Sequence, residues 1–150
     1  MSASAIESIL TLKRVYDVPV ARLWRAWTDP KELGQWYVAG DDHVVHFCEA
    51  DVRVGGTYRV GFGPPNAKPY VETGRYTEVT PLSRLSFEET VTNTEDVVVH
   101  TNLTIVDFLG LAAGKSQLAI TSIGPHSWRT GQGWTPCMES LARYLAKAVS

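Results

Sequence analysis

Cysteine is scarce in this sequence, and long apolar runs are missing. The two cysteines, Cys48 and Cys137, are too few for a disulfide framework and fall in segments predicted as a strand and a helix, which indicates buried free thiols. The apolar runs fall far short of the ~20 residues that cross a bilayer, and the N-terminus lacks the basic start and apolar centre of a secretion signal. We therefore expect a cytoplasmic protein without a membrane span.

The chain also has little excess charge. Its formal net charge is −2, and its 14 lysines and arginines are scattered, so no basic patch is available for a phosphate backbone. Nucleic acid is therefore not an expected partner. Glycine, proline and serine never accumulate into a disordered tract, and 150 residues suffice to bury a sizeable core. These properties predict a single domain over residues 1–150, with residues 1–7 flexible.

The first forty residues predict a strand followed by a helical corner. Ser8 to Tyr16 alternates in apolar and β-branched character, which favours a strand. Pro19 suits the first turn of a helix, and the segment 20–27 has apolar residues at helical spacing. Asp29 is a good N-cap and Pro30 a good first residue for a second short helix that ends near Trp36.

The next eighty residues predict six strands, joined by turns rich in glycine, proline and asparagine. So many short connections indicate an antiparallel sheet. The strand candidates are residues 43–50, 57–63, 70–79, 84–91, 97–108 and 116–123. Residues 124–133 are then expected to form a loop, and 133–150 a helix. An apolar stripe runs along that helix through Trp134, Met138, Leu141, Leu145 and Ala148.

This order predicts an α+β fold, in which a curved antiparallel sheet of about seven strands packs against the C-terminal helix. One helix fills the hollow of a bent sheet poorly, so side chains or a ligand must occupy the rest. Alternation along the strands and the stripe of the helix predict an apolar lining with a few polar tips, which suits either a solid core or a small-molecule cavity. The predicted lining residues are Trp36, Tyr37, Tyr58, Val60, Phe62, Tyr76, Phe87, Glu89, Trp134, Met138 and Leu141.

Four segments resemble one known family in the order in which they occur. RVYDVPVARLWRAWTDPKELGQWY, EADVRVGGTYRV, GRYTEVTPLSRLSF and GWTPCMESLARYL are similar to signatures of the family named after the activator of the heat-shock-protein-90 ATPase. That family belongs to the START, polyketide-cyclase and birch-pollen-allergen (SRPBCC, Bet v 1-like) superfamily. The resemblance implies a helix-grip fold with a cavity between the sheet and the long helix.

This chain departs from the family at one position that bears on the cavity. The family often has Trp-Trp where this sequence has Trp36 and Tyr37, so Tyr37 would add a hydroxyl to the mouth of the pocket.

Few residues suggest catalysis, and no metal or cofactor is expected. His43 and His46 are three apart on a predicted strand, so they point to opposite faces and cannot share one ion. Glu89, and less strongly Glu78, are the carboxylates predicted to face inward, and burial without a cation would raise the pKa of Glu89. A register shift of one residue would turn Glu88 inward instead.

Three functions remain open. The first is binding of an apolar or aromatic, lipid- or polyketide-like molecule, without catalysis of any reaction. The second is a cyclase, aromatase or hydratase in which Glu89, Tyr58, Tyr76 or a histidine transfers protons. The third is an interaction module for a chaperone, and a homodimer is compatible with the sequence. A binding protein needs only a cavity, an enzyme needs two convergent titratable groups, and an interaction module needs an exposed apolar patch.

Overall fold

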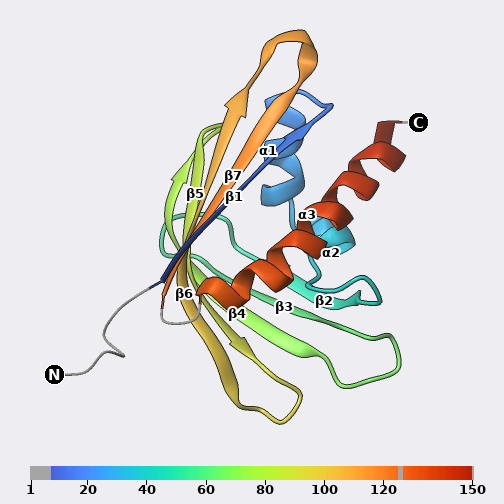
Figure 1. Ribbon diagram of the computed structural model, residues 1–150, viewed down its shortest axis with the longest axis vertical. Helices are drawn as coiled ribbons and strands as arrows, with labels where there is room; N and C mark the ends of the chain where they lie inside the picture. The colour runs from blue at the N-terminus through green and yellow to red at the C-terminus, as the bar shows by residue number, and fades with distance from the viewer. Residues whose placement is uncertain (1–7, 125–126, 150) are drawn as a thin grey trace, which may run out of the picture.

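The computed structural model describes residues 8–124 and 127–149 as a curved sheet gripping a long helix (Figure 1). Seven strands form one antiparallel sheet in the order β1-β7-β6-β5-β4-β3-β2. The C-terminal helix α3 crosses one face of this sheet, and α1 and α2 lie on the same side (Figure 1). The predicted helix-grip class is therefore confirmed. The prediction about residues 1–7 falls outside the described residues.

The strands occupy the segments that the alternation of the sequence predicts. β1 is paired with β7 along its whole length, so the first and last strands of the chain are neighbours. The bounds are β1 Ser8–Tyr16, β2 Val44–Ala50, β3 Thr57–Gly63, β4 Tyr70–Thr80, β5 Arg84–Thr92, β6 Val98–Gly110 and β7 Ser116–Gly124. A single 3-10 turn, η2 at Ala112–Gly114, joins the last two strands.

The helical corner follows its capping signals. α1 spans Val20–Thr28 and α2 spans Pro30–Trp36, with Asp29 between them. The Asp29 carboxylate accepts a hydrogen bond of 3.0 Å from the Lys31 backbone N–H, and Pro30 occupies the first helical position. The indole N–H of Trp36 donates to the Ala26 carbonyl oxygen at 3.0 Å. The predicted stop and restart at Thr28 to Pro30 is confirmed.

The C-terminal helix starts earlier than predicted. α3 spans Ser127–Val149, so the prediction of a loop over 124–133 is wrong from Ser127 onward. Glycine is a poor helix former, and Gly131 and Gly133 lie in the segment that was expected to be a loop. Packing of α3 on the sheet and α2 overrides these local preferences, and Pro136 lies inside the helix. Four residues of the predicted stripe are buried, Trp134, Met138, Leu141 and Leu145, and the burial of Ala148 lies outside the described residues.

A cluster around Glu32 fixes the helical corner against α3. The Glu32 carboxylate accepts hydrogen bonds from Arg22 at 2.6 Å, Arg25 at 2.8 Å and the Tyr144 hydroxyl at 2.9 Å. Burial raises the pKa of Glu32, but the hydrogen bonds from Tyr144 and the arginines outweigh it, so the pKa lies below its usual value. Charged groups therefore hold α1, α2 and α3 together at this corner.

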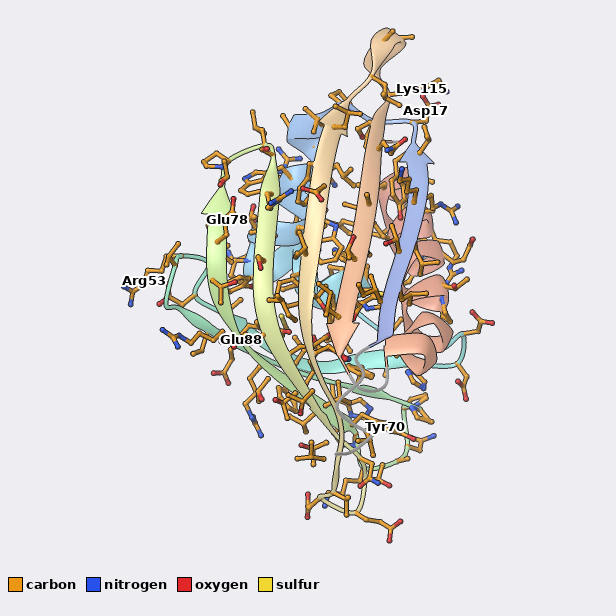
Figure 2. All side chains as sticks on the ribbon, turned by 60° about the vertical axis from the view of Figure 1, so that its left-hand side comes forward. Asp17, Arg53, Tyr70, Glu78, Glu88 and Lys115 are labelled. Atoms are coloured by element: carbon orange, nitrogen blue, oxygen red, sulfur yellow. The ribbon has the colours of Figure 1, made fainter. Side chains whose placement is uncertain are left out.

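The register of β4 and β5 decides which carboxylates face the helix. Glu89 is buried on the inner face and Glu88 is exposed, so the predicted register of β5 is confirmed. Glu78 lies on the outer face instead, because the pairing of β4 with β5 shifts between Tyr76 and Glu78 and reverses the alternation. Figure 2, which looks onto the outer face, shows Glu78 and Glu88 there.

The turn before β3 has the predicted glycine requirement. Gly55 adopts a φ of 83°, which side chains disfavour, and a Cβ on Gly56 would come within 2.0 Å of the Asp51 carbonyl oxygen. The Arg53 guanidinium donates to the Asp51 carboxylate at 2.8 Å, as the sequence suggested. None of the helices described is long and apolar enough to span a membrane.

Candidate functional site

A cavity of about 430 Å³ lies between α3 and strands β3 to β6. Its volume falls within the range of ~300–1,000 Å³ that is common for small-molecule sites. Helix α3, the segment that follows α2 and the four strands all contribute to its wall. The lining residues are Tyr37, Val38, Ala39, His43, Phe62, Tyr70, Glu72, Glu89, Val91, Val99, Gly133, Trp134 and Cys137. We call this region the cavity half of the interior.

The interior next to α1 and α2 is packed. A void there measures only about 10 Å³, and aromatic side chains of the helical corner and of β3 to β5 surround it. Trp27 packs edge-on against Trp36, with ring centroids 4.9 Å apart. We call this region the filled half, and its bordering residues are Trp27, Leu33, Tyr37, Tyr58, Tyr76, Leu85 and Phe87. Tyr37 borders both halves.

The structure divides the predicted lining residues between these two regions. Four of them line the cavity: Tyr37, Phe62, Glu89 and Trp134. The other seven do not line it, although all of them are buried: Trp36, Tyr58, Val60, Tyr76, Phe87, Met138 and Leu141. The alternation identified the inner face correctly. It carries no information on position along the strand, and the helical corner fills one end of the hollow.

Two buried glutamates form the polar floor of the cavity. Glu72 of β4 is 4% exposed and Glu89 of β5 is 2% exposed, and a hydrogen bond joins their carboxyl groups. The hydroxyls of Tyr37 and Tyr58 donate to Glu72 Oε2 at 2.7 and 2.5 Å. The Thr104 hydroxyl donates to Glu89 Oε1 at 2.5 Å. The described partners of the pair are thus hydroxyls or the other carboxyl.

This geometry raises the pKa of both carboxyl groups. Burial raises the pKa of Glu89 well above its usual value, and the adjacent charge of Glu72 raises it further. Burial also raises the pKa of Glu72, but hydrogen bonds from Tyr58, Tyr37 and Glu89 favour its charged form and limit the rise. Of the two carboxyl groups, Glu89 therefore holds its proton more firmly than Glu72 does.

Both tyrosines remain donors under all ordinary conditions. Burial, together with the charge of Glu72, raises the pKa of the Tyr37 and Tyr58 hydroxyls well above 10.0. The Tyr37 hydroxyl lies inside the molecule on Glu72, so the expectation that it sits at the mouth of the pocket is wrong. Because Tyr37 lies at the boundary of the two halves, its ring packs in the core while its hydroxyl donates to Glu72.

Aromatic rings form the wall beside the glutamates. The rings of His43, Phe62 and Tyr70 are nearly parallel, and their centroids lie 5.9 to 6.3 Å apart. Trp134 adds an indole from α3 and packs edge-on against Tyr37 at 5.9 Å. The cavity thus combines an aromatic wall with two buried carboxyl groups.

His43, His46 and the two thiols form no reactive arrangement among the described side chains. His46 bonds the Pro64 carbonyl oxygen at 3.0 Å, whereas His43 stacks in the cavity wall. Both cysteines are free, and burial raises the pKa of Cys48 to about 11 and that of Cys137 still further above its usual value. Within residues 8–124 and 127–149, no cluster of three metal-binding side chains occurs.

Sequence reasoning missed Glu72, the other member of the pair. The signal was present, because Glu72, Gly74 and Tyr76 alternate on one face of β4. The missing side chain at Gly74 also has a reason. A Cβ there would come within 2.0 Å of the Tyr58 ring, so the glycine leaves room for the tyrosine that bonds Glu72. What the sequence did not reveal is that β4 and β5 bring Glu72 and Glu89 together.

Comparisons with known proteins identify relatives of this fold. The family profile described as “Activator of Hsp90 ATPase homolog 1-like protein” matches residues 17–146. A crystal structure from Nitrosomonas europaea is 24% identical, with 99% of this chain and 98% of that chain covered and a TM-score of 0.77.

Two further structures show the same likeness. An AHSA1-like protein from Aeromonas hydrophila is 21% identical, with 94% of each chain covered and a TM-score of 0.78. A protein from Chromobacterium violaceum is 25% identical, with 91% of this chain and 96% of that chain covered and a TM-score of 0.72. The comparison with curated proteins gives no match.

Proposed function

This chain belongs to the family of Activator of Hsp90 ATPase homolog 1-like proteins, and we propose that it binds an apolar or aromatic small molecule in the cavity between its sheet and α3. The observation that carries the proposal is the contrast inside one interior. Aromatic side chains pack one half to a residual void of about 10 Å³, whereas about 430 Å³ stays open in the other. Natural cores rarely leave such a volume empty without a use for it.

The chemistry of the lining supports a ligand that is mainly apolar. Phe62, Tyr70 and Trp134 offer ring surfaces, and Val91 and Val99 add aliphatic surface. Polar groups are concentrated on the floor, at Glu72 and Glu89, where they can fix the orientation of a bound molecule. We propose the cavity-lining residues as the binding site, with Tyr58 and Thr104 as positioning residues that act through the glutamates.

Native mass spectrometry of the purified protein is the direct test, followed by a thermal-shift screen of lipids, polyketide-like aromatics and flavonoids. We expect the mass spectrum to show a ligand retained by the protein or added to it. In the thermal-shift screen, a ligand should raise the unfolding temperature. The variant Val91→Phe places a ring in the cavity and should abolish the shift. If Val91→Phe binds every hit as tightly as the natural chain does, the ligand lies elsewhere and the proposal fails.

The glutamate pair favours a second candidate function, acid–base catalysis. Glu89, whose pKa is raised more strongly, can act as the acid and Glu72 as the base, and both border the ligand space. The reaction class would be proton transfer, as in a cyclisation or hydration. Incubating each hit with the protein and following its mass and absorbance tests this idea. Turnover that Glu89→Gln reduces by about 10²-fold or more, with binding retained, would support catalysis. Recovery of every hit unchanged would leave binding alone.

A further inference from the structure

The floor of the cavity holds two buried carboxyl groups, Glu72 and Glu89, that form no salt bridge with a described cation. The salt bridges among the described side chains involve other carboxylates, and none reaches Glu72 or Glu89. The hydroxyls of Tyr37, Tyr58 and Thr104 satisfy the hydrogen bonds of the pair without supplying positive charge. A buried carboxylate in such surroundings strongly attracts a cation.

The aromatic wall beside the floor fits the same kind of group. A cation within about 6 Å of a ring face is attracted by the electrons of the ring, most strongly where water is excluded. His43, Phe62 and Tyr70 stack near one another, and Tyr37 and Trp134 complete the aromatic part of the wall. A carboxylate beneath several aromatic rings is the arrangement that recognises alkylammonium groups.

From these two observations we infer that the cavity selects an organic cation, a molecule whose ammonium group lies over Glu72 while its apolar or aromatic body contacts Phe62, Trp134 and Val91. This inference rests on the proposed function, because it specifies the class of ligand bound at that site. It adds a requirement, a positive charge on the ligand, that a purely apolar ligand does not meet. The charge of the ligand, and not only its shape, determines affinity.

Two probes of equal shape separate charge from size. Benzyltrimethylammonium and neopentylbenzene differ only in a quaternary nitrogen that replaces a carbon, so their difference in affinity reports the charge. Titration of the full chain, followed by tryptophan fluorescence and by backbone amide NMR, should show the cation binding at least about tenfold more tightly. The amide shifts should centre on β4, β5 and the segment from Tyr37 to His43.

The double variant Glu72→Gln/Glu89→Gln removes the charge and keeps side chains of similar size. Both residues are replaced because Glu89 would ionise more readily once Glu72 is neutral. The preference for the cation should fall to about threefold or less, while neopentylbenzene still binds and shows that the cavity is intact. The matched control is Glu49→Gln/Glu88→Gln, which removes two exposed glutamates from strands β2 and β5 of the same sheet and should keep the tenfold preference.

The possible outcomes distinguish this inference from the proposed function. If both probes bind the natural chain equally, the inference is overturned and the cavity remains a site for apolar molecules. If the preference survives in the double variant, the charge that selects the ligand lies elsewhere and the inference is overturned as well. If neither probe binds and the screen gives no hit at all, the proposed function fails together with it.

Discussion

The filled half and the cavity half of this interior contain the same kinds of side chain but use them differently. In the filled half, Trp27, Trp36 and Phe87 meet edge to face with their neighbours and leave a void of only about 10 Å³. In the cavity half, Phe62, Tyr70 and Trp134 line open space. Aromatic composition therefore does not distinguish a core from a binding site. What distinguishes the two halves is whether another layer of secondary structure packs against the aromatic side chains.

The opposing layer is the helical corner. α1 and α2 pack against the sheet at one end of α3, and their tryptophans fill the hollow there. At the other end, α3 and the segment from Tyr37 to His43 face β3 to β6 across open space. The two glutamates occur in the open half, where a bound molecule can reach them. This comparison makes three predictions, given from the largest expected effect to the smallest.

Truncating one phenylalanine in each half should give unequal losses of stability. Phe87→Ala removes a ring that protein atoms surround, so we expect unfolding to become easier by about 3–5 kcal/mol. Phe62→Ala removes a ring that already borders open space, and less than half of that loss is expected. Urea denaturation of both variants measures the difference. Equal losses would mean that the cavity half is packed as tightly as the filled half.

Adding one ring to each half should reveal the same asymmetry in the opposite direction. Val106→Phe enlarges a fully buried residue that does not line the cavity, and overpacking should cost about 1–3 kcal/mol. Val91→Phe points the added ring into the cavity and should cost less than about 1 kcal/mol. Chemical denaturation of the unliganded variants tests this. A larger loss for Val91→Phe than for Val106→Phe would contradict the division.

The pH dependence of stability should have opposite signs at the buried glutamate pair and at Glu32 of the helical corner. The raised pKa values of Glu72 and Glu89 mean that the folded chain holds a proton that the unfolded chain releases above 4.5. This contribution makes stability fall as pH rises from 4.5 toward the folded pKa, by up to about 1.4 kcal/mol per pH unit for one proton. The lowered pKa of Glu32 contributes stability above 4.5, which is lost as pH falls through its folded pKa.

Denaturation from about pH 5 to about pH 8 measures the first of these effects. Glu72→Gln/Glu89→Gln should flatten the fall in stability with rising pH, because the variant has no buried proton to lose. Glu88→Gln should follow the natural chain, since Glu88 is exposed on the other face of β5. An unchanged slope in the double variant would show that the pair is not the buried group that titrates.

Local signals in the sequence predicted most of the fold. The alternation of Leu85, Phe87 and Glu89 gave the inner face of β5, and the cap at Asp29 with Pro30 gave the helical corner. These signals are local because a strand alternates every second residue and a helix begins where a side chain can cap it. Prediction failed where distant contacts decide the local structure. α3 extends through Gly131 and Gly133, and a bulge after Tyr76 turns Glu78 outward.

The candidate site was less accessible to prediction than the fold. Four of the predicted residues line the cavity and seven pack in the core, because strand periodicity selects a face but not a place along it. Glu72 was not predicted even though it alternates with Tyr76. A single glutamate in a strand is usually a surface residue, and a register shift of one residue would turn it outward.

The sequence by itself determined the inner face of each strand, the capped corner and the family, since all of these depend on residues that are close together in the chain. Only the tertiary structure decided that Glu72 meets Glu89 beside an open space. That meeting requires β4 and β5 to pair at one register, Tyr37 and Tyr58 to arrive from separate elements, and α3 to leave one end of the hollow uncovered. Burial of a shared proton is a property of that assembled environment, and no segment of the chain contains it alone.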